Sequence, residues 1–285
     1  MRITAKELSF TYNKKSAFKA DALKGVTLDI PEGEFFGIIG HTGSGKSTFI
    51  QHLNALLTVQ SGTLTVGDID LSKGKKTDKK LLKVLRSKVG MVFQYPEYQL
   101  FAETVFEDVA FGYKNFNPQA DENLVKTAVY DALTRVGLDY SIAKKSPFEL
   151  SGGQKRRVAI AGVIVTSPEV LVLDEPVAGL DPIGKRELMR LLHELHSTTS
   201  KTVIIVSHDM DEVCENCTRV AVFSQGEVIA EGTPEEVFSQ GEKMRGLRLG
   251  VPLTEYLSER LAEKGVNLNC DLTENDFIRA VKELC

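Results

Sequence analysis

A glycine-rich loop between an apolar run and a helical pattern constrains this chain most strongly. Residues 35–39 form an uncharged apolar run, as expected of a strand that is buried on both faces of a sheet. Residues 46–57 then follow a helical pattern. The loop between them reads Gly40-His41-Thr42-Gly43-Ser44-Gly45-Lys46-Ser47. A strand, a loop of this composition and a helix, in that order, predict a phosphate-binding turn in an α/β protein.

The chemistry of phosphate binding explains this composition. Glycines allow successive backbone N–H groups to surround a phosphate, and the following helix adds its positive N-terminal end. Lys46 would place its charge on the β- and γ-phosphates, and the Ser47 hydroxyl would ligate Mg²⁺. Thr48 follows and can reach the α-phosphate. A flexible glycine turn would not need the Lys-Ser pair, so we predict a site for ATP and Mg²⁺.

A second apolar run ends in two carboxylates. Residues 170–173 are all Val or Leu, and Asp174 and Glu175 follow directly. At a strand end beside the phosphate loop, Asp174 can serve Mg²⁺. Glu175 can polarise an attacking water and accept its proton. A surface turn often carries two acids, but four apolar residues before them argue against that alternative.

The remaining pattern predicts an α/β fold with a parallel sheet and helices on both faces. Residues 3–12 and 23–30 show the alternation of strands, and residues 202–206 form another buried run. Residues 104–150 have a helical pattern. Residues 234–285 are predicted to form short helices without a further buried strand.

The segment Leu150-Ser151-Gly152-Gly153-Gln154 resembles the LSGGQ signature of the ABC ATPases without a departure. The resemblance covers about residues 1–245. It implies a P-loop NTPase fold, in which a parallel-sheet core carries an antiparallel β N-terminal subdomain and an α-helical signature subdomain at about residues 95–165. Residues 246–285 would form a small helical C-terminal appendage.

The same resemblance implies roles for further residues. Gln94 resembles the Q-loop glutamine, and His208 resembles the switch histidine; with Glu175 they form the implied catalytic set. Asp181 closes the D-loop pattern, which here begins Val177-Ala178 where many relatives carry Thr-Ser or Thr-Ala. The implied metal ligands are Ser47, Gln94 and Asp174. The implied nucleotide-binding residues are Tyr12, Gly40, His41, Thr42, Gly43, Ser44, Gly45, Lys46, Ser47, Thr48, Ser151, Gly152, Gly153, Gln154 and Asp181, with Tyr12 stacking on adenine. The signature residues would serve the ATP of an opposite subunit, in a head-to-tail dimer.

Residues 94–112 and 150–163 further resemble the ATPases of energy-coupling factor (ECF) transporters. That branch imports vitamins or transition-metal ions such as cobalt or nickel. The resemblance implies a second ATPase subunit, either a non-identical paralogue or an identical chain, and a transmembrane coupling protein. Small substrate-binding membrane proteins would join that complex, so the sequence of this chain does not reveal the transported substrate. The C-terminal appendage would help to hold the two ATPases together.

Two surface features have more than one interpretation. Several aromatic and apolar residues follow Gln94 and form either a docking surface or the core of the helical subdomain; they are Tyr95, Tyr98, Leu100, Phe101, Phe106 and Phe111. Residues 72–88 are rich in lysine and indicate an exposed helix or loop, either solvated or facing an anionic partner.

Composition excludes several classes of protein. The net charge of −4 argues against a nucleic-acid partner. No apolar run is long enough for a transmembrane helix, and the N-terminus lacks a signal peptide. We therefore expect a peripheral protein at the cytoplasmic face of the cell membrane. Another ABC importer or exporter, a soluble ABC ATPase and a nucleotide sensor are the alternative functions.

A C-x-x-C pair, Cys214 and Cys217, lacks the second pair that a zinc site requires. We interpret the two cysteines as small residues on a helix, with one turned inward.

Overall fold

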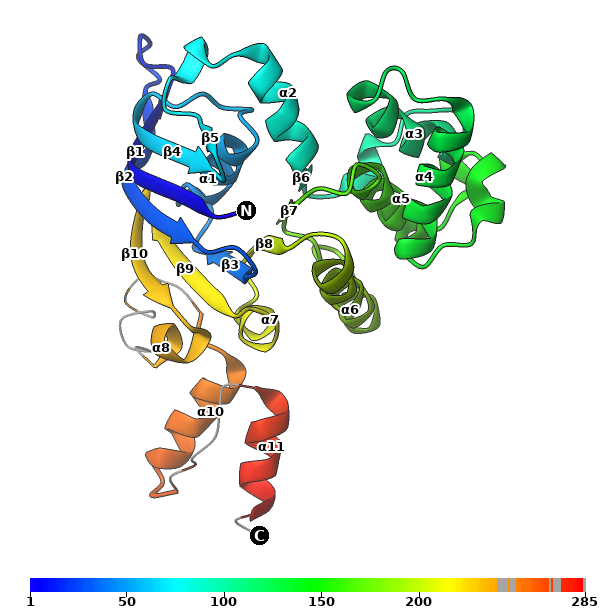
Figure 1. The fold of residues 1–285 in the computed structure, drawn as a ribbon. Helices are drawn as coiled ribbons and strands as arrows, with labels where there is room; N and C mark the ends of the chain where they lie inside the picture. The colour runs from blue at the N-terminus through cyan, green and yellow to red at the C-terminus, as the bar shows by residue number, and fades with distance from the viewer. Residues whose placement is uncertain (240–245, 247–249, 267, 269–272, 284–285) are drawn as a thin grey trace.

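Two β-sheets form the centre of the molecule (Figure 1). The computed structural model describes the chain except residues 240–245, 247–249, 267, 269–272 and 284–285. The strands are β1 (Ile3–Tyr12), β2 (Ala20–Ile30), β3 (Phe35–Ile39), β4 (Ser61–Val66), β5 (Ile69–Asp70), β6 (Val89–Val92), β7 (Val170–Asp174), β8 (Thr202–Ser207), β9 (Arg219–Ser224) and β10 (Glu227–Gly232). The helices are α1 (Lys46–Leu53), α2 (Lys79–Lys88), α3 (Val105–Phe116), α4 (Glu122–Arg135), α5 (Gly152–Ile164), α6 (Pro182–Thr198), α7 (Met210–Asn216), α8 (Pro234–Phe238), α10 (Leu253–Ala262) and α11 (Glu274–Glu283).

The larger sheet has the strand order β10-β9-β3-β8-β7-β6. All neighbouring strands in it are parallel except β10, which runs antiparallel to β9. Strands β3, β8, β7 and β6 are therefore adjacent and end at the same edge. The smaller sheet has the order β2-β1-β4-β5 and is antiparallel throughout. Both the parallel core and the antiparallel N-terminal sheet confirm the predicted fold class.

Side chains alternate between the two faces of the parallel sheet, and both faces are buried. On β3, Phe35 and Ile39 belong to one hydrophobic cluster, which also contains residues of α5, α6 and α7. Phe36 and Ile38 belong to a second cluster, together with α1 and the antiparallel sheet. The apolar run therefore has the doubly buried position that its composition predicts.

The helical lobe of the molecule contains α3, α4 and α5 (Figure 1). Thr104 caps the N-terminus of α3, and Asp121 caps α4. The helical prediction for residues 104–150 is confirmed only up to Arg135, since 3₁₀ turns at Tyr140–Lys144 and Pro147–Glu149 follow. Similarly, α1 ends at Leu53 and not at residue 57, because the backbone turns at Asn54 and Ala55, which has a positive φ of 51°.

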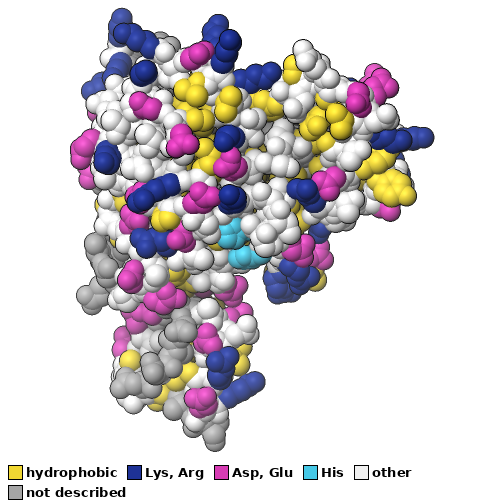
Figure 2. Space-filling model, viewed as in Figure 1, with side chains coloured by type: hydrophobic (Ala, Val, Ile, Leu, Met, Phe, Trp, Pro, Cys, Tyr) yellow, Lys and Arg dark blue, Asp and Glu magenta, His cyan; other side chains and the backbone are white. Residues whose placement is uncertain are grey.

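The lysine-rich segment forms a short 3₁₀ turn at Gly74–Lys76 and then α2. Within α2, Leu85 is fully buried, whereas Lys79, Lys80 and Lys83 are exposed. Figure 2 shows dark blue side chains gathered at the end of the molecule that carries α2 in Figure 1. An exposed helix is therefore confirmed for this segment.

The interpretation of the cysteine pair is wrong in one respect, because both side chains are buried. Cys214 lies on α7, and Cys217 caps its C-terminal end. A Cβ built on Gly37 of β3 would lie 3.0 Å from the Cys217 sulfur, so the glycine leaves the space that this thiol fills. Burial raises the pKa of both thiols.

A buried carboxyl lies behind the end of β8. Glu212 of α7 is 8% exposed, and its Oε2 accepts a hydrogen bond of 3.0 Å from Oγ of Ser207. Burial raises the pKa of Glu212 to about 7. The nearby carboxylates of Asp209 and Glu175 raise it further, while the Ser207 hydrogen bond and the charge of Lys185 oppose the rise.

This burial predicts a pH dependence of stability. The folded chain retains the Glu212 proton up to about pH 7, whereas the unfolded chain loses it near the ordinary value of 4.5. The free energy of unfolding should therefore fall by roughly 3 kcal/mol from this group between those two pH values, and change no further above them. Glu212→Gln should abolish that part of the slope while still accepting the Ser207 hydrogen bond. Urea denaturation at pH 5 and pH 8 measures the free energy of unfolding of the wild type and of Glu212→Gln. An equal change between the two pH values in both proteins would contradict this prediction.

Candidate active site

A cavity of about 760 Å³ lies at the edge where β3, β8, β7 and β6 end. Each of these strands leads directly into a residue of the cavity wall: Gly40 after β3, His208 after β8, Glu175 after β7, and Gln94 shortly after β6. The predicted site residues that line it are Tyr12, Gly40, His41, Thr42, Gly43, Ser44, Gly45, Lys46, Ser47, Thr48, Gln94, Asp174, Glu175 and His208. Parallel strands thus bring together residues that are far apart in the sequence.

The phosphate loop closes tightly around the Lys46 side chain. Its Nζ donates hydrogen bonds to the carbonyl oxygens of Gly40 at 2.6 Å and His41 at 3.0 Å. Burial lowers the pKa of Lys46, although Glu175 and Asp174 partly offset this effect. The loop allows no side chain at Gly45, which has a φ of 107°, because a Cβ there would lie 2.6 Å from the carbonyl oxygen of Ala22.

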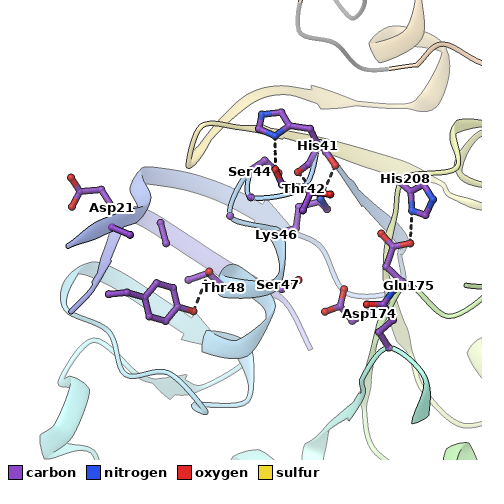
Figure 3. Close-up of a pocket in the computed structure, with 17 residues that line it drawn as sticks. Asp21, His41, Thr42, Ser44, Lys46, Ser47, Thr48, Asp174, Glu175 and His208 are labelled. Carbon is purple, nitrogen blue, oxygen red and sulfur yellow. Dashed lines mark hydrogen bonds and ion pairs between the residues drawn. The ribbon is translucent and has the colours of Figure 1, made fainter. Parts of the chain in front are cut away.

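The donor groups of the loop fit a triphosphate with Mg²⁺. The Ser44 hydroxyl is buried without a hydrogen-bond partner among the described residues, so it is available for a ligand. Asp174 lies beside Ser47 (Figure 3), and the cavity is polar on this side. Burial raises the pKa of Asp174, while a hydrogen bond with Ser47 and the charge of Lys46 oppose the rise. Hydroxyl and carboxylate oxygens of this kind are the ligands that Mg²⁺ prefers.

Glu175 and His208 form a hydrogen-bonded pair at the opposite wall of the cavity (Figure 3). His208 Nδ1 lies 2.5 Å from Oε2 of Glu175. The Glu175 backbone has a positive φ of 51°, and its N–H donates to the carbonyl of Val206 at 2.9 Å. This turn takes the Glu175 side chain away from the strand direction and into the cavity. His208 is largely exposed at the rim, whereas Glu175 is mostly buried.

The wall of the cavity around Tyr12 was only partly predicted. Tyr12 lines it, and its hydroxyl lies 3.3 Å from Oγ1 of Thr48. Ala20, Asp21 and Ala22 of β2 also line this part of the wall, and they lie outside the strand predicted at residues 23–30. The signal was available in the pairing of the first two strands, because Tyr12 lies opposite Ala20 in the register.

The signature residues do not line the cavity of their own chain. Ser151 caps α5, and its side chain forms a capping box with Gln154. Gly152 and Gly153 are exposed, and a Cβ built on either would meet nothing within 4 Å. Asp181 likewise lies outside the cavity, where it caps α6 through a 2.7 Å bond from the Gly184 N–H.

Comparison with known proteins gives consistent matches. A family model described as "ABC transporter" matches residues 23–178. The chain is 47% identical over 279 residues to the energy-coupling factor transporter ATP-binding protein EcfA2 of Lacticaseibacillus paracasei, covering 97% of this chain and 95% of that protein. It is 49% identical over 283 residues to EcfA2 of Symbiobacterium thermophilum, covering 99% and 96%.

Solved structures are similar as well. CbiO1 of Clostridium perfringens, part of the ABC transporter complex CbiONQ, superposes with a TM-score of 0.74 at 40% identity, covering 90% of this chain and 98% of that one. The ATP-binding cassette MJ0796, solved as a dimer bound to ADP and Pi, has a TM-score of 0.71 at 31% identity, covering 81% and 98%. The family and the branch that the sequence motifs resemble are both confirmed. The chain therefore belongs to the ATP-hydrolysing ATP-binding proteins of ABC transporters, and among these to the energy-coupling factor branch.

Proposed function

We propose that this chain binds MgATP and hydrolyses it, together with a second ATPase subunit, to drive an ECF importer of vitamins or transition-metal ions. The observation that carries this proposal is the convergence of four strand ends on one cavity, which combines the phosphate loop with Asp174 and the Glu175–His208 pair. The transported substrate depends on other polypeptides of the complex.

The cavity residues divide the chemistry of hydrolysis between them. The backbone N–H groups of the loop and the Lys46 ammonium bind the phosphates. Glu175 accepts a proton from the attacking water, whose oxygen forms a bond to the γ-phosphorus as the bond to the ADP oxygen breaks. His208 orients Glu175 and faces the γ-phosphate from the rim. Ser47, Asp174 and Gln94 would hold Mg²⁺, which neutralises charge on the phosphate oxygens when it is bound.

The signature residues support a site shared between two subunits. The N-terminus of α5 exposes Ser151, Gly152 and Gly153, and a Cβ built on either glycine would meet no atom within 4 Å. Backbone N–H groups at a helix N-terminus bind phosphate well. In the proposed head-to-tail dimer, these groups contact the γ-phosphate held by the other subunit. The other subunit is either a paralogue or a second copy of this chain.

Glu175→Gln tests the assignment of the base. The amide cannot accept the proton of water, so we expect turnover of MgATP to fall by about 10²- to 10⁴-fold. Binding of ATP should persist, because the phosphate loop is unchanged. The variant should accumulate as an ATP-bound dimer, which size-exclusion chromatography with and without ATP would detect. Unchanged turnover in Glu175→Gln would remove this residue from the base role.

Exposed aromatic side chains in the segment after Gln94 support docking to a transmembrane coupling protein. Tyr98, Phe101 and Phe111 are 84%, 62% and 54% exposed, whereas Leu100 is buried and Phe106 is partly buried. Next to them, an apolar groove of about 310 Å³ lies between the parallel sheet and the helical lobe, lined by Leu56, Met91, Phe93, Gly112, Phe116 and Val163 among others. Leu100 and Phe106 thus belong to the core, whereas docking is our proposal for the exposed Tyr98, Phe101 and Phe111.

The double variant Tyr98→Glu/Phe101→Glu tests this surface. We expect affinity for the membrane partner to fall at least about tenfold, because two apolar contacts would be replaced by desolvated charges. Leu124→Glu, also on the helical lobe and 54% exposed, is the matched control and should assemble normally. Co-purification from detergent-solubilised membranes measures the assembly. Normal assembly of the double variant would exclude the surface.

None of the helices formed by the described residues combines the length and the apolar character needed to span a bilayer. We infer that the chain is held at the cytoplasmic face of the cell membrane through the proposed docking surface. No nucleic-acid partner is part of this proposal.

The C-terminal helices support a role in ATPase–ATPase contact. In the described part of residues 246–285, α10 and α11 lie beyond α8, at the end of the molecule away from the helical lobe (Figure 1). Apolar side chains on them remain exposed, with Leu253 at 58%, Tyr256 at 47% and Ile278 at 41%. An apolar face of this kind is suited to a second subunit.

Removal of residues 246–285 tests this role. Among the described residues, the buried members of the two hydrophobic clusters all come before this segment, and only the partly buried Val251 packs against one of them, so we expect the shortened chain to fold and to bind ATP. Its association with the second ATPase should weaken at least about tenfold. Sedimentation of the Glu175→Gln form with ATP, with and without the appendage, compares the dimer fractions. Equal fractions would show that the appendage does not hold the subunits together.

A further inference from the structure

Arg156 lies almost completely buried in α5, five positions after the signature Ser151. One edge of its guanidinium forms a bidentate pair with Glu97, which belongs to the 3₁₀ turn Pro96–Gln99. Nε donates to Oε2 at 3.1 Å, and Nη2 donates to Oε1 at 2.9 Å. A fork of this geometry fixes both the distance and the orientation of the two segments.

The other donors of Arg156 hold the backbone that follows the catalytic carboxylate. Nη1 donates to the carbonyl of Pro176 at 3.2 Å, and Nη2 also donates to the carbonyl of Ala178 at 3.1 Å. These carbonyls lie one and three residues after Glu175, whose own backbone has the left-handed conformation described above. Arg156 therefore restrains the turn from which the Glu175 side chain enters the cavity.

The 3₁₀ turn that Glu97 belongs to connects the cavity with the molecular surface. Gln94 lines the cavity three residues before Glu97, and the exposed Tyr98 follows Glu97 directly. The Tyr95 ring lies close to the D-loop, since a Cβ built on Gly179 would be 3.4 Å from its Cε1. A displacement of the exposed aromatic side chains, which include Tyr98, would therefore move Glu97. Through the bidentate pair, it would also move the guanidinium of Arg156.

Packing alone does not explain a charged pair at this place. A buried ion pair is often no more stabilising than apolar side chains of similar volume. Burial on its own would raise the pKa of Glu97, but the hydrogen bonds and charge of Arg156 outweigh it and lower that pKa, so the carboxylate is charged near neutral pH. The planar guanidinium provides four directed bonds to three residues in two segments, which neither lysine nor an apolar side chain can reproduce.

We propose that Arg156 is a positioning residue that transmits movement of the docking turn, through Glu97, to the backbone that sets Glu175 in the cavity. The transmission rests on the proposed docking to a membrane protein, whereas the positioning of Glu175 concerns hydrolysis in the cavity of this chain and does not require the membrane protein. Because Arg156 and Ser151 share one helix, the same contact also ties the signature residues to the docking turn.

Two variants separate the two halves of the proposal. Arg156→Lys keeps the charge but loses the fork, so kcat for MgATP should fall at least tenfold while KM changes less than twofold. Glu97→Gln leaves the bonds from Arg156 to Pro176 and Ala178 in place, so ATPase activity of this chain with its second ATPase subunit, without the membrane partners, should stay within twofold. In the complex with its membrane partners, however, Glu97→Gln should lose most of the change in ATPase rate that assembly causes.

Arg157 is the matched control, because it is the next residue of the same helix and also bonds a carbonyl and a carboxylate, those of Val136 and Glu187. Arg157→Lys should leave the kcat and the effect of assembly within twofold of the wild type. Thermal melting of each variant establishes that it is folded; if Arg156→Lys does not fold, Glu97→Gln alone tests the transmission.

The results distinguish this inference from the proposed function. A wild-type kcat in Arg156→Lys, or an equal loss in Arg157→Lys, would overturn the positioning role. A normal response to assembly in Glu97→Gln would overturn the transmission. By contrast, if the wild-type chain neither hydrolyses MgATP nor changes its rate on assembly, the proposed function itself fails.

Discussion

The parallel alignment of β3, β8, β7 and β6 is the constraint on which the site depends. Their register places Ile39 beside Ser207, Val206 beside Asp174, and Leu173 beside Val92, so the four strands end within about one residue of each other. The residues that follow these strands therefore lie at the same edge of the sheet. Because the two faces of these strands pack into two different hydrophobic clusters, a slip of one residue would move each side chain into a cluster that it does not fit. Core packing therefore fixes the geometry of the cavity.

Two oppositely charged side chains of the cavity, Lys46 and Asp174, form hydrogen bonds with other groups. Lys46 donates to loop carbonyls, and Asp174 shares a hydrogen bond with Ser47, so neither uses the other as its partner. Burial shifts the pKa of each toward its neutral form. A triphosphate with its cation would satisfy both groups at once, since it brings charges of both signs. The polar groups are already oriented, which reduces the reorganisation that binding requires.

Local patterns were sufficient to predict the parts of the site that lie in short continuous segments. The phosphate loop, Asp174 and Glu175 are each recognisable from a buried strand and the residues that follow it. Strands β4, β5, β6, β9 and β10 were missed; β5 and β6 have only two and four residues, which is too short for a recognisable alternation. The contact between Glu97 and Arg156 spans 59 positions in the sequence and depends on the packing of the helical lobe against the sheet. No spacing rule predicts such a pair.

Helix α5 carries both the signature residues, which are proposed to contact the ATP of the other subunit, and Arg156, which is proposed to position Glu175 of its own chain. Its N-terminal residues are exposed and suited to the ATP of another subunit, while Arg156, one turn further on, holds the backbone beside Glu175 of its own chain. A rigid helix cannot shift at one end without shifting at the other. Closure of the signature onto a partner's ATP would therefore act on the carboxylate in this chain's own cavity. The two composite sites of a dimer would then be coupled mechanically through two such helices, without direct contact between the nucleotides.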